Sequence, residues 1–261
     1  MIRGLFRICA VIAGGLVLIS LPSEIQAATF SVNPTRMELS ANHRADIINF
    51  TNTGSTPLRL QARTMLWGMQ ADGHWQLTPS DDLIVTPELL EVAPGSVAQL
   101  RVGSLVDGTT SEGSYRILLN ELPNLGDDGS TQRQQIRVLT EISLPVFLEP
   151  VAVTRIPDIR SASMVLGVLT VAVGNEGSQR LDPQGITVSV IDNAGNTVSR
   201  RTMMSNYVLA DAMWPLNITL PANDCAKAAS VSLSWSGISD TPITHAITTD
   251  GTRACASTAG H

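Results

Sequence analysis

One stretch of this sequence alternates between apolar and polar residues for longer than an ordinary β-strand does. Within residues 133–150 (RQQIRVLTEISLPVFLEP), every second position from 136 to 148 falls on one face of an extended chain. The segment 136–148 would span about 43 Å at 3.3 Å per residue, roughly twice the length of a usual strand. That face carries Ile136, Val138, Thr140, Ile142, Leu144, Val146 and Leu148. Only Thr140 among them is polar, so the fold must cover an unusually long apolar stripe.

The first 27 residues have the pattern of a secretory signal peptide. Arg3 and Arg7 precede an apolar run over residues 8–21, and small residues follow at Ala27 and Ala28. A membrane anchor is the alternative, but this run is shorter than the roughly 18 residues that a spanning helix needs. We therefore expect cleavage after Ala27, a periplasmic location and no membrane span in the mature chain.

The charge of the chain argues against a nucleic-acid partner. The sequence has 17 basic and 23 acidic residues, and residues 1–27 contain two of the basic and one of the acidic ones. The mature chain keeps 15 basic and 22 acidic residues. Nucleic-acid-binding domains carry an excess of basic residues instead.

The cysteines predict one disulfide. Cys9 leaves with the signal peptide, and Cys225 and Cys255 remain as an even pair in an exported protein. A catalytic thiol pair is the alternative, but the two residues are far from C-x-x-C spacing. We expect a bridge that ties the C-terminal tail to the second domain.

Short alternating or apolar runs, separated by turn residues, fill the chain after residue 28. Eight runs precede Pro150 and six follow it, with turn sequences such as NTGSTP, ADG, APGS and DNAG between runs. None of the segments has sustained helical periodicity. The pattern predicts an all-β fold of two β-sandwich domains, residues 28–150 and 151–261.

The sequence contains no motif that is typical of a catalytic or metal site. His43, His74, His245 and His261 lie in separate contexts without metal-ligand spacing, and no nucleophile or phosphate-binding motif is present. We expect no enzyme, no cofactor and no metal. A secreted hydrolase on a β-sandwich is an alternative that would need a cluster of acid–base or metal-binding residues.

Five stretches, in order along the chain, resemble the periplasmic PapD-like chaperones of the chaperone–usher pathway of pilus assembly. They are VNPTR (32–36), NFTNTGSTPLRLQA (49–62), TPELLEVAPGSVAQLRV (86–102), YRILLNELP (115–123) and LTEISLPVFLEP (139–150). The resemblance covers the first domain almost end to end and is weaker in the second. It implies two immunoglobulin-like domains in a boomerang arrangement. It also implies a chaperone that binds pilus subunits and delivers them to an outer-membrane usher.

The resemblance gives the long stripe a use. In this family the subunit lacks the last strand of its immunoglobulin-like fold, and the chaperone lends a strand to complete it. We assign Ile136, Val138, Thr140 and Ile142 to this subunit-binding strand, and Ile142 also begins the part that faces the chaperone's own core. The alternative, a stripe that belongs wholly to one core, is disfavoured by its length.

In the better-known branch of the family, an Arg of the first strand and a Lys near the end of the last strand of domain one hold the subunit's terminal carboxylate. Arg36 matches that Arg. The Lys position aligns with Pro145, and the only lysine of the chain is Lys227. A buried carboxylate still needs a cation, so another residue must replace the lysine.

Arg116 is our candidate for the replacement. A hairpin centred near residue 127 or 128 would place Arg116 opposite residues 139–141, close to the lending segment. A cross-strand pair with Glu141 is the alternative, and Arg133 and Arg137 are weaker candidates for the anchor.

The joint between the domains also departs from the better-known branch, which pairs an acidic residue with an Arg there. Glu121 keeps the acid, but Glu149 stands in the Arg position, so other contacts must hold the joint. In these features the chain is more similar to the archaic branch, whose subunits resemble spore coat protein U.

A second function, of another class, is a two-domain immunoglobulin-like structural protein or adhesin that polymerises through its edge strands. Such a protein should begin with a free alternating extension. FSVNPTRMEL follows the expected cleavage site almost directly and leaves no such extension.

Overall fold

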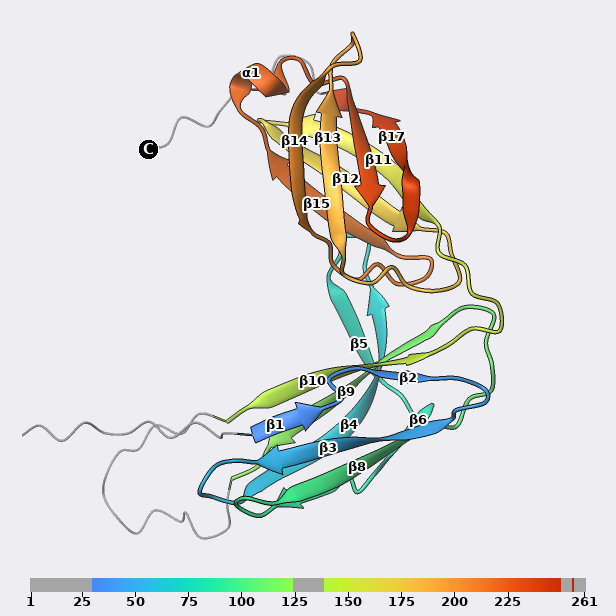
Figure 1. The fold of residues 1–261 in the computed structure, drawn as a ribbon, viewed down its shortest axis with the longest axis vertical. Coiled ribbons are helices and arrows are strands. Elements are labelled where there is room, and N and C mark those ends of the chain that lie inside the picture. Colours follow the sequence, from blue (N-terminus) through green and yellow to red (C-terminus); the bar gives the residue numbers. More distant parts are fainter. Residues whose placement is uncertain (1–29, 124–138, 250–254, 256–261) are drawn as a thin grey trace, which may run out of the picture.

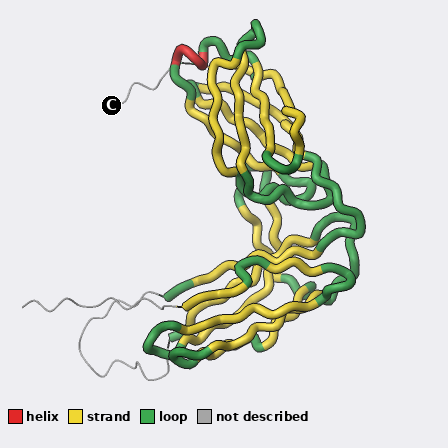
Figure 2. Tube along the Cα trace, viewed as in Figure 1, coloured by secondary structure: helices red, strands yellow, loops and turns green. Residues whose placement is uncertain are grey.

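The computed structural model describes residues 30–123, 139–249 and 255, and these residues form two β-sandwiches that meet at an angle (Figures 1 and 2). A short helix, α1 (Ala222–Cys225), is the only helix in these ranges. None of the helical structure in the described residues is long and apolar enough to cross a membrane. The predicted all-β fold is confirmed.

The N-terminal sandwich packs two sheets against each other. Its strands are β1 (Phe30–Asn33), β2 (Met37–Leu39), β3 (Ala45–Asn52), β4 (Leu58–Met69), β5 (Trp75–Pro79), β6 (Leu83–Thr86), β7 (Leu89–Val92), β8 (Val97–Ser104), β9 (Gly113–Glu121) and β10 (Glu141–Leu148). One sheet has the order β1-β3-β8-β6. The other has the order β2-β10-β9-β4-β5, and β7 also pairs with β4.

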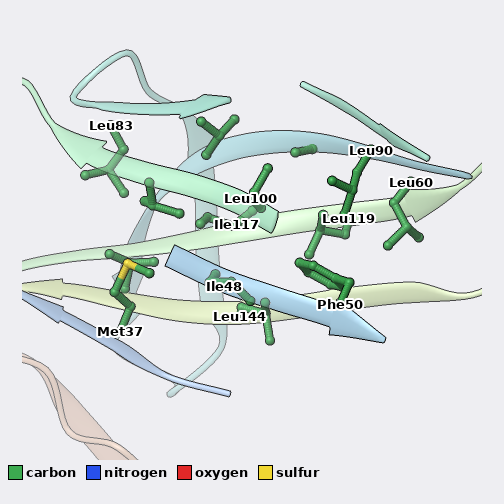
Figure 3. Close-up of a cluster of buried hydrophobic side chains, with 14 of the residues drawn as sticks. Met37, Ile48, Phe50, Leu60, Leu83, Leu90, Leu100, Ile117, Leu119 and Leu144 are labelled. Atoms are coloured by element: carbon green, nitrogen blue, oxygen red, sulfur yellow. The ribbon is translucent and has the colours of Figure 1, made fainter. Parts of the chain in front are cut away.

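The core of this sandwich follows from period-two alternation on its strands. Ile48 and Phe50 of β3 point into the space between the sheets, where they meet Ile117 and Leu119 of β9 (Figure 3). All four side chains are at most 1% exposed. Burial of each such side chain contributes about 1.5–3 kcal/mol, so these strands supply much of the force that closes the sandwich.

Two parts of the N-terminal strand pattern differ from the expectation. The run over residues 30–39 is divided between the two sheets, because β1 pairs with β3 whereas β2 pairs in parallel with β10. Pro34, which has no amide hydrogen to donate to a ladder, lies between the two strands. Strand β7 was not expected as a separate strand.

The C-terminal sandwich has a core of its own. Its strands are β11 (Pro157–Val165), β12 (Val168–Asn175), β13 (Gly185–Ile191), β14 (Thr197–Met204), β15 (Met213–Thr219), β16 (Ser230–Trp235), β17 (Ser239–Ala246) and β18 (Thr248–Thr249). They form sheets of order β15-β12-β11-β18 and β14-β13-β16-β17. Sequence analysis missed β11, in which a register shift between Ile159 and Ser161 breaks the alternation. The expected domain boundary at Pro150 falls in the connection between β10 and β11.

The expected disulfide is present. Cys225 and Cys255 are joined with a Cα–Cα distance of 5.6 Å, and 30 residues separate them in the sequence. A cross-link that closes a loop of this length stabilises a fold by about 3–4 kcal/mol, mainly by restricting the unfolded chain. The bridge fastens residue 255 to the core of the C-terminal sandwich.

The β4–β5 hairpin of the N-terminal sandwich reaches the C-terminal one (Figure 1). Gly73, at its tip, has a φ of +81°, and a Cβ atom there would lie 2.3 Å from Cδ of Pro215 on β15. Only glycine permits both this backbone conformation and this close approach. The hairpin tip is therefore a point of direct contact between the two sandwiches.

Candidate functional site

One face of the larger N-terminal sheet points away from its own core and toward the C-terminal sandwich. Met37 of β2, Val146 of β10 and Tyr115 of β9 are cross-strand neighbours, and we call such a row of neighbours a level of the sheet. The side chains of this level are buried in the core. Since side chains alternate between the faces of a sheet, the adjacent level points the other way. That level holds Pro145 and Arg116, which are direct cross-strand partners, and Arg36, which precedes β2. We call these three residues the arginine row; about 10 Å separates the backbones of its two arginines.

The guanidinium group of Arg116 is enclosed by aromatic rings. Its Cζ atom lies 4.0 Å from the ring centroid of Trp67 and 3.9 Å from that of Trp75. The two ring planes are 64° apart, so the guanidinium lies in the angle between the rings. Its Nη1 donates to Oγ of Ser143 at 3.2 Å, and only 5% of the residue is exposed.

Arg116 is a buried cation that has no counterion among the described residues. Its Nε is buried and has no hydrogen-bond partner, and no carboxylate of the described residues pairs with the guanidinium. Burial lowers the pKa of Arg116 to about 10, against the opposing influence of Tyr207, so the group remains charged at neutral pH. Its two cation–π contacts each contribute about 0.5–2 kcal/mol. The desolvated charge and the free donor make this position suited to an anion.

Arg36 is more exposed and already has acidic partners. Its Nη2 lies 3.1 Å from Oε1 of Glu38, and its Nη1 lies 3.2 Å from Oδ1 of Asp182 in the C-terminal sandwich. Partial burial lowers the pKa of Arg36, but a hydrogen bond with Tyr207 and the charges of Asp182 and Glu38 outweigh this effect and raise it. A ligand at Arg36 would therefore share a cation that two carboxylates already contact.

The expected position of Arg116 was wrong in register. Arg116 lies opposite Pro145, about five residues from the predicted partners at 139–141, and Glu141 lies opposite Asn120. The alternative pair of Arg116 with Glu141 is also wrong, because the Glu141 carboxylate accepts a hydrogen bond from Asn120 at 2.6 Å. The observed register places Arg116 beside Pro145, the residue that stands at the expected lysine position.

An aromatic cluster joins this face to the C-terminal sandwich. The ring centroid of Tyr207 lies 5.5 Å from that of Trp67 and 5.6 Å from that of Phe147. Leu209 of the C-terminal sandwich is buried in the same cluster. Sequence reasoning missed it, because its members come from β4, β10 and a loop between β14 and β15 that only the tertiary fold brings together.

The joint between the sandwiches is held by a second buried arginine, Arg180. Its side chain is 2% exposed and donates to the Glu112 carboxylate, to Oε1 of Glu38 at 2.6 Å and to Oδ1 of Asp182 at 2.9 Å. Its Cζ also lies 3.5 Å from the ring centroid of Phe147. Glu38 and Glu112 belong to the N-terminal sandwich, so this ion network crosses the joint. No motif marked Arg180, which lies in the loop between β12 and β13.

The arginine row and the joint share two oxygen atoms. Oε1 of Glu38 and Oδ1 of Asp182 each contact both Arg36 and Arg180. Glu121, the acid expected at the joint, instead accepts a hydrogen bond from the backbone of Thr140 at 3.1 Å. The joint is thus connected to the candidate site through Arg36.

A cavity of about 220 Å³ borders the ion network and does not suit an anionic ligand. It is lined by Glu38, Leu39, Ser40, Glu112, Phe147, Glu149, Gln179 and Arg180. Three of these residues are acidic and one is basic, so a carboxylate would be repelled there. Burial raises the pKa of Glu112 to about 7, although Arg180 acts in the opposite direction.

The predicted subunit-binding strand is described only in part. Ile136 and Val138 lie outside the described residues, as do the weaker anchor candidates Arg133 and Arg137. Thr140 precedes β10 and accepts a backbone hydrogen bond from Glu121. Ile142 is half-buried and packs against the core of its own sandwich. Leu144, Val146 and Leu148 are buried there too, in agreement with the expectation for the later part of the stripe.

The fold is shared with chaperones of known structure. The chain aligns with a chain of the CsuC–CsuE chaperone–tip adhesion subunit pre-assembly complex from the archaic Csu pili of Acinetobacter baumannii, at a TM-score of 0.56 and 18% identity, over 85% of this chain and 99% of that one. It aligns with the class 5 fimbriae chaperone CfaA at a TM-score of 0.56 and 11% identity, over 84% and 99%. It also aligns with a chain of the Salmonella enterica complex of SafA pilin with the SafB chaperone. The TM-score is 0.51 and the identity 15%, over 85% of this chain and 97% of that one. No curated protein matches the chain.

The family is defined by the N-terminal sandwich. Residues 29–154 match the family model of the pili and flagellar-assembly chaperone PapD N-terminal domain. The match spans that sandwich from β1 to the loop after β10. The N-terminal sandwich is therefore a domain of the PapD N-terminal type, as found in pili and flagellar-assembly chaperones.

We predict that Arg180→Ala destabilises the protein by about 3–5 kcal/mol at pH 8, because it leaves the buried Glu112 carboxylate without its partner. Urea unfolding measures the change. Arg160→Ala is the matched control: Arg160 also contacts two acids, but its side chain is 41% exposed, and its loss should cost less than about 1 kcal/mol. Equal effects of the two substitutions would contradict the assignment of Arg180 to the joint.

The pKa of Glu112 predicts a pH dependence. Because this pKa is about 7 in the folded protein and lies above its ordinary value of 4.5, the folded state binds the proton more tightly. The resulting stabilisation is complete below pH 4.5, declines up to about pH 7 and is absent above it. Between pH 4.5 and 7, the unfolding free energy of the wild type should fall, relative to that of Glu112→Gln, by up to about 1.4 kcal/mol per pH unit. Unfolding free energies measured from pH 4.5 to 8 test this, and a constant difference between the proteins would refute it.

Proposed function

We propose that this chain is a non-enzymatic periplasmic chaperone that captures pilus-type subunits by lending them a strand and passes them to an outer-membrane usher. The lending strand contains Ile136, Val138, Thr140 and Ile142. The protein needs no cofactor or metal for this task. Pro145 in place of the lysine favours the archaic branch of the family.

The observation that carries the proposal is an open sheet edge beside the arginine row. Strand β2 pairs with β10 only at Val146–Leu148. Over residues 141–145, β10 pairs with β9 on one side, and no strand of the described part of the chain pairs with it on the other. Such an edge offers unpaired backbone groups to a strand from another protein. The lending segment thus continues into an edge that can accept a guest strand.

The open edge also supports a proposal for where a guest strand ends. Strand β2 occupies the same edge of β10 from Val146 onward. A strand added to this edge therefore cannot extend beyond Pro145, because β2 blocks the next positions. A guest strand parallel to β10 would bring its C-terminal carboxylate to this level. Arg116 and Arg36 lie in the same row on either side of Pro145, which supports their assignment as the carboxylate anchor.

Arg116 is the better prepared of the two arginines. It has no acidic partner in the described residues and keeps a buried, unpaired Nε donor, whereas Arg36 is shared with Glu38 and Asp182. A charge-assisted hydrogen bond to a carboxylate contributes about 1.5–3 kcal/mol. We therefore assign the main share of carboxylate binding to Arg116 and a secondary share to Arg36.

Val138→Asp tests strand lending. The chain is co-expressed with the secreted β-rich subunits of its own genome and recovered through an affinity tag. The wild type should retain a subunit, and the variant should retain none, because an aspartate cannot be buried in the subunit's apolar groove. Val97→Asp, at a position 59% exposed on β8, should behave as wild type. Normal recovery with Val138→Asp would rule out strand lending, and no subunit with the wild type would refute the proposed function.

Arg116→Met tests the anchor. A peptide with the sequence of the recovered subunit's last strand is made with a free C-terminal carboxylate and with a C-terminal amide. The variant should bind the carboxylate peptide at least about tenfold more weakly, and the amide peptide as the wild type does. Its stability should change little, since relief of the desolvated charge offsets the loss of the two cation–π contacts and of the Ser143 hydrogen bond. Arg101→Met, on the other sheet, is the control, and equal losses for both peptides would exclude Arg116 as the anchor.

A further inference from the structure

Tyr207 of the C-terminal sandwich is packed against the arginine row of the N-terminal one. Its ring meets Trp67 edge-on, at an interplanar angle of 82°, and lies at 43° to Phe147. Trp67 in turn forms one wall of the niche that holds the Arg116 guanidinium. Two ring contacts therefore fix the position of the Tyr207 side chain next to the candidate carboxylate site.

The hydroxyl group of Tyr207 lies next to Arg36 of the arginine row. A hydrogen bond with Tyr207 is among the causes that raise the pKa of the Arg36 guanidinium. A guanidinium can only donate hydrogen bonds, so the phenolic oxygen must be the acceptor toward Arg36. The O–H proton of Tyr207 then remains available, and no acceptor for it is found in the described parts of the chain.

The backbone next to Tyr207 is fixed to the ion network of the joint. Val208 and Leu181 exchange two backbone hydrogen bonds, at 2.8 and 3.1 Å. Leu181 is flanked by Arg180 and Asp182, which form the ion pairs described above. The joint therefore holds the Tyr207 loop in a set position relative to the N-terminal sheet.

We propose that Tyr207 is the third binding group of the carboxylate anchor and that its hydroxyl donates a hydrogen bond to the captured C-terminal carboxylate. This inference rests on the proposed function and extends it: the anchor is built from both sandwiches, with two cations from one and a neutral donor from the other. Two guanidinium groups and one hydroxyl together can satisfy both oxygens of a carboxylate.

Tyr207→Phe is the decisive variant, because it keeps the ring and its contacts with Trp67 and Phe147 and removes only the hydroxyl. Binding is measured by calorimetry with the carboxylate and amide forms of the subunit peptide used above. We expect the variant to bind the carboxylate peptide about tenfold more weakly than the wild type does. The amide peptide should bind both proteins equally.

Tyr115→Phe is the matched control, since Tyr115 is the only other tyrosine of the chain and its hydroxyl donates to Asp82 at 3.0 Å. This substitution can lower stability, but it should leave the ratio of the two peptide affinities unchanged. A second variant, Tyr207→Leu, removes the ring as well and should not weaken carboxylate-specific binding much beyond Tyr207→Phe.

The possible outcomes separate this inference from the proposed function. If Tyr207→Phe binds both peptides as the wild type does, the hydroxyl is no part of the anchor, and the chaperone function stands. If Tyr207→Phe lowers the affinity for both peptides equally, Tyr207 acts only by packing, and the inference is wrong. If the wild type binds the carboxylate and amide peptides equally, the proposed carboxylate anchor is wrong. If the wild type captures no subunit, the proposed chaperone function is wrong.

Discussion

The buried guanidinium of Arg180 is the interaction on which the arrangement of the two sandwiches depends. It pairs with Glu112 and Glu38 of the N-terminal sandwich and with Asp182 of its own. Taking such a group out of water is costly unless its donors are satisfied, and here partners from both sandwiches satisfy them. The two sandwiches must therefore keep the relative position in which these partners meet. That position also brings Tyr207 to the arginine row.

Most of the fold could be predicted because its strands obey simple alternation. The core residues of β3, β9 and the later part of β10 occupy every second position, and this period is visible without any knowledge of neighbours. Strand β11 escaped prediction because its bulge interrupts the period. The register of β9 against β10 was misjudged because the alternation fixes which face a residue is on, and not which residue lies opposite it.

The candidate site was predictable only to the extent that single residues carried a signal. Arg36 and Arg116 were identified through the family resemblance and the missing lysine. Trp67, Trp75, Tyr207 and Arg180 were not identified, because their roles arise from contacts between segments far apart in the sequence. The physical character of Arg116, a cation enclosed by two rings, depends on the side chains around it and cannot be read from β9 alone.

The contact of Gly73 with Pro215 has a consequence for the mobility of the molecule. The β4–β5 hairpin acts as a spacer: a closing rotation of the sandwiches would press a rigid proline ring into the hairpin backbone. The ion network at the joint resists opening in the same way that this spacer resists closing. A binding partner therefore meets a preformed frame, and little conformational entropy is lost when it docks.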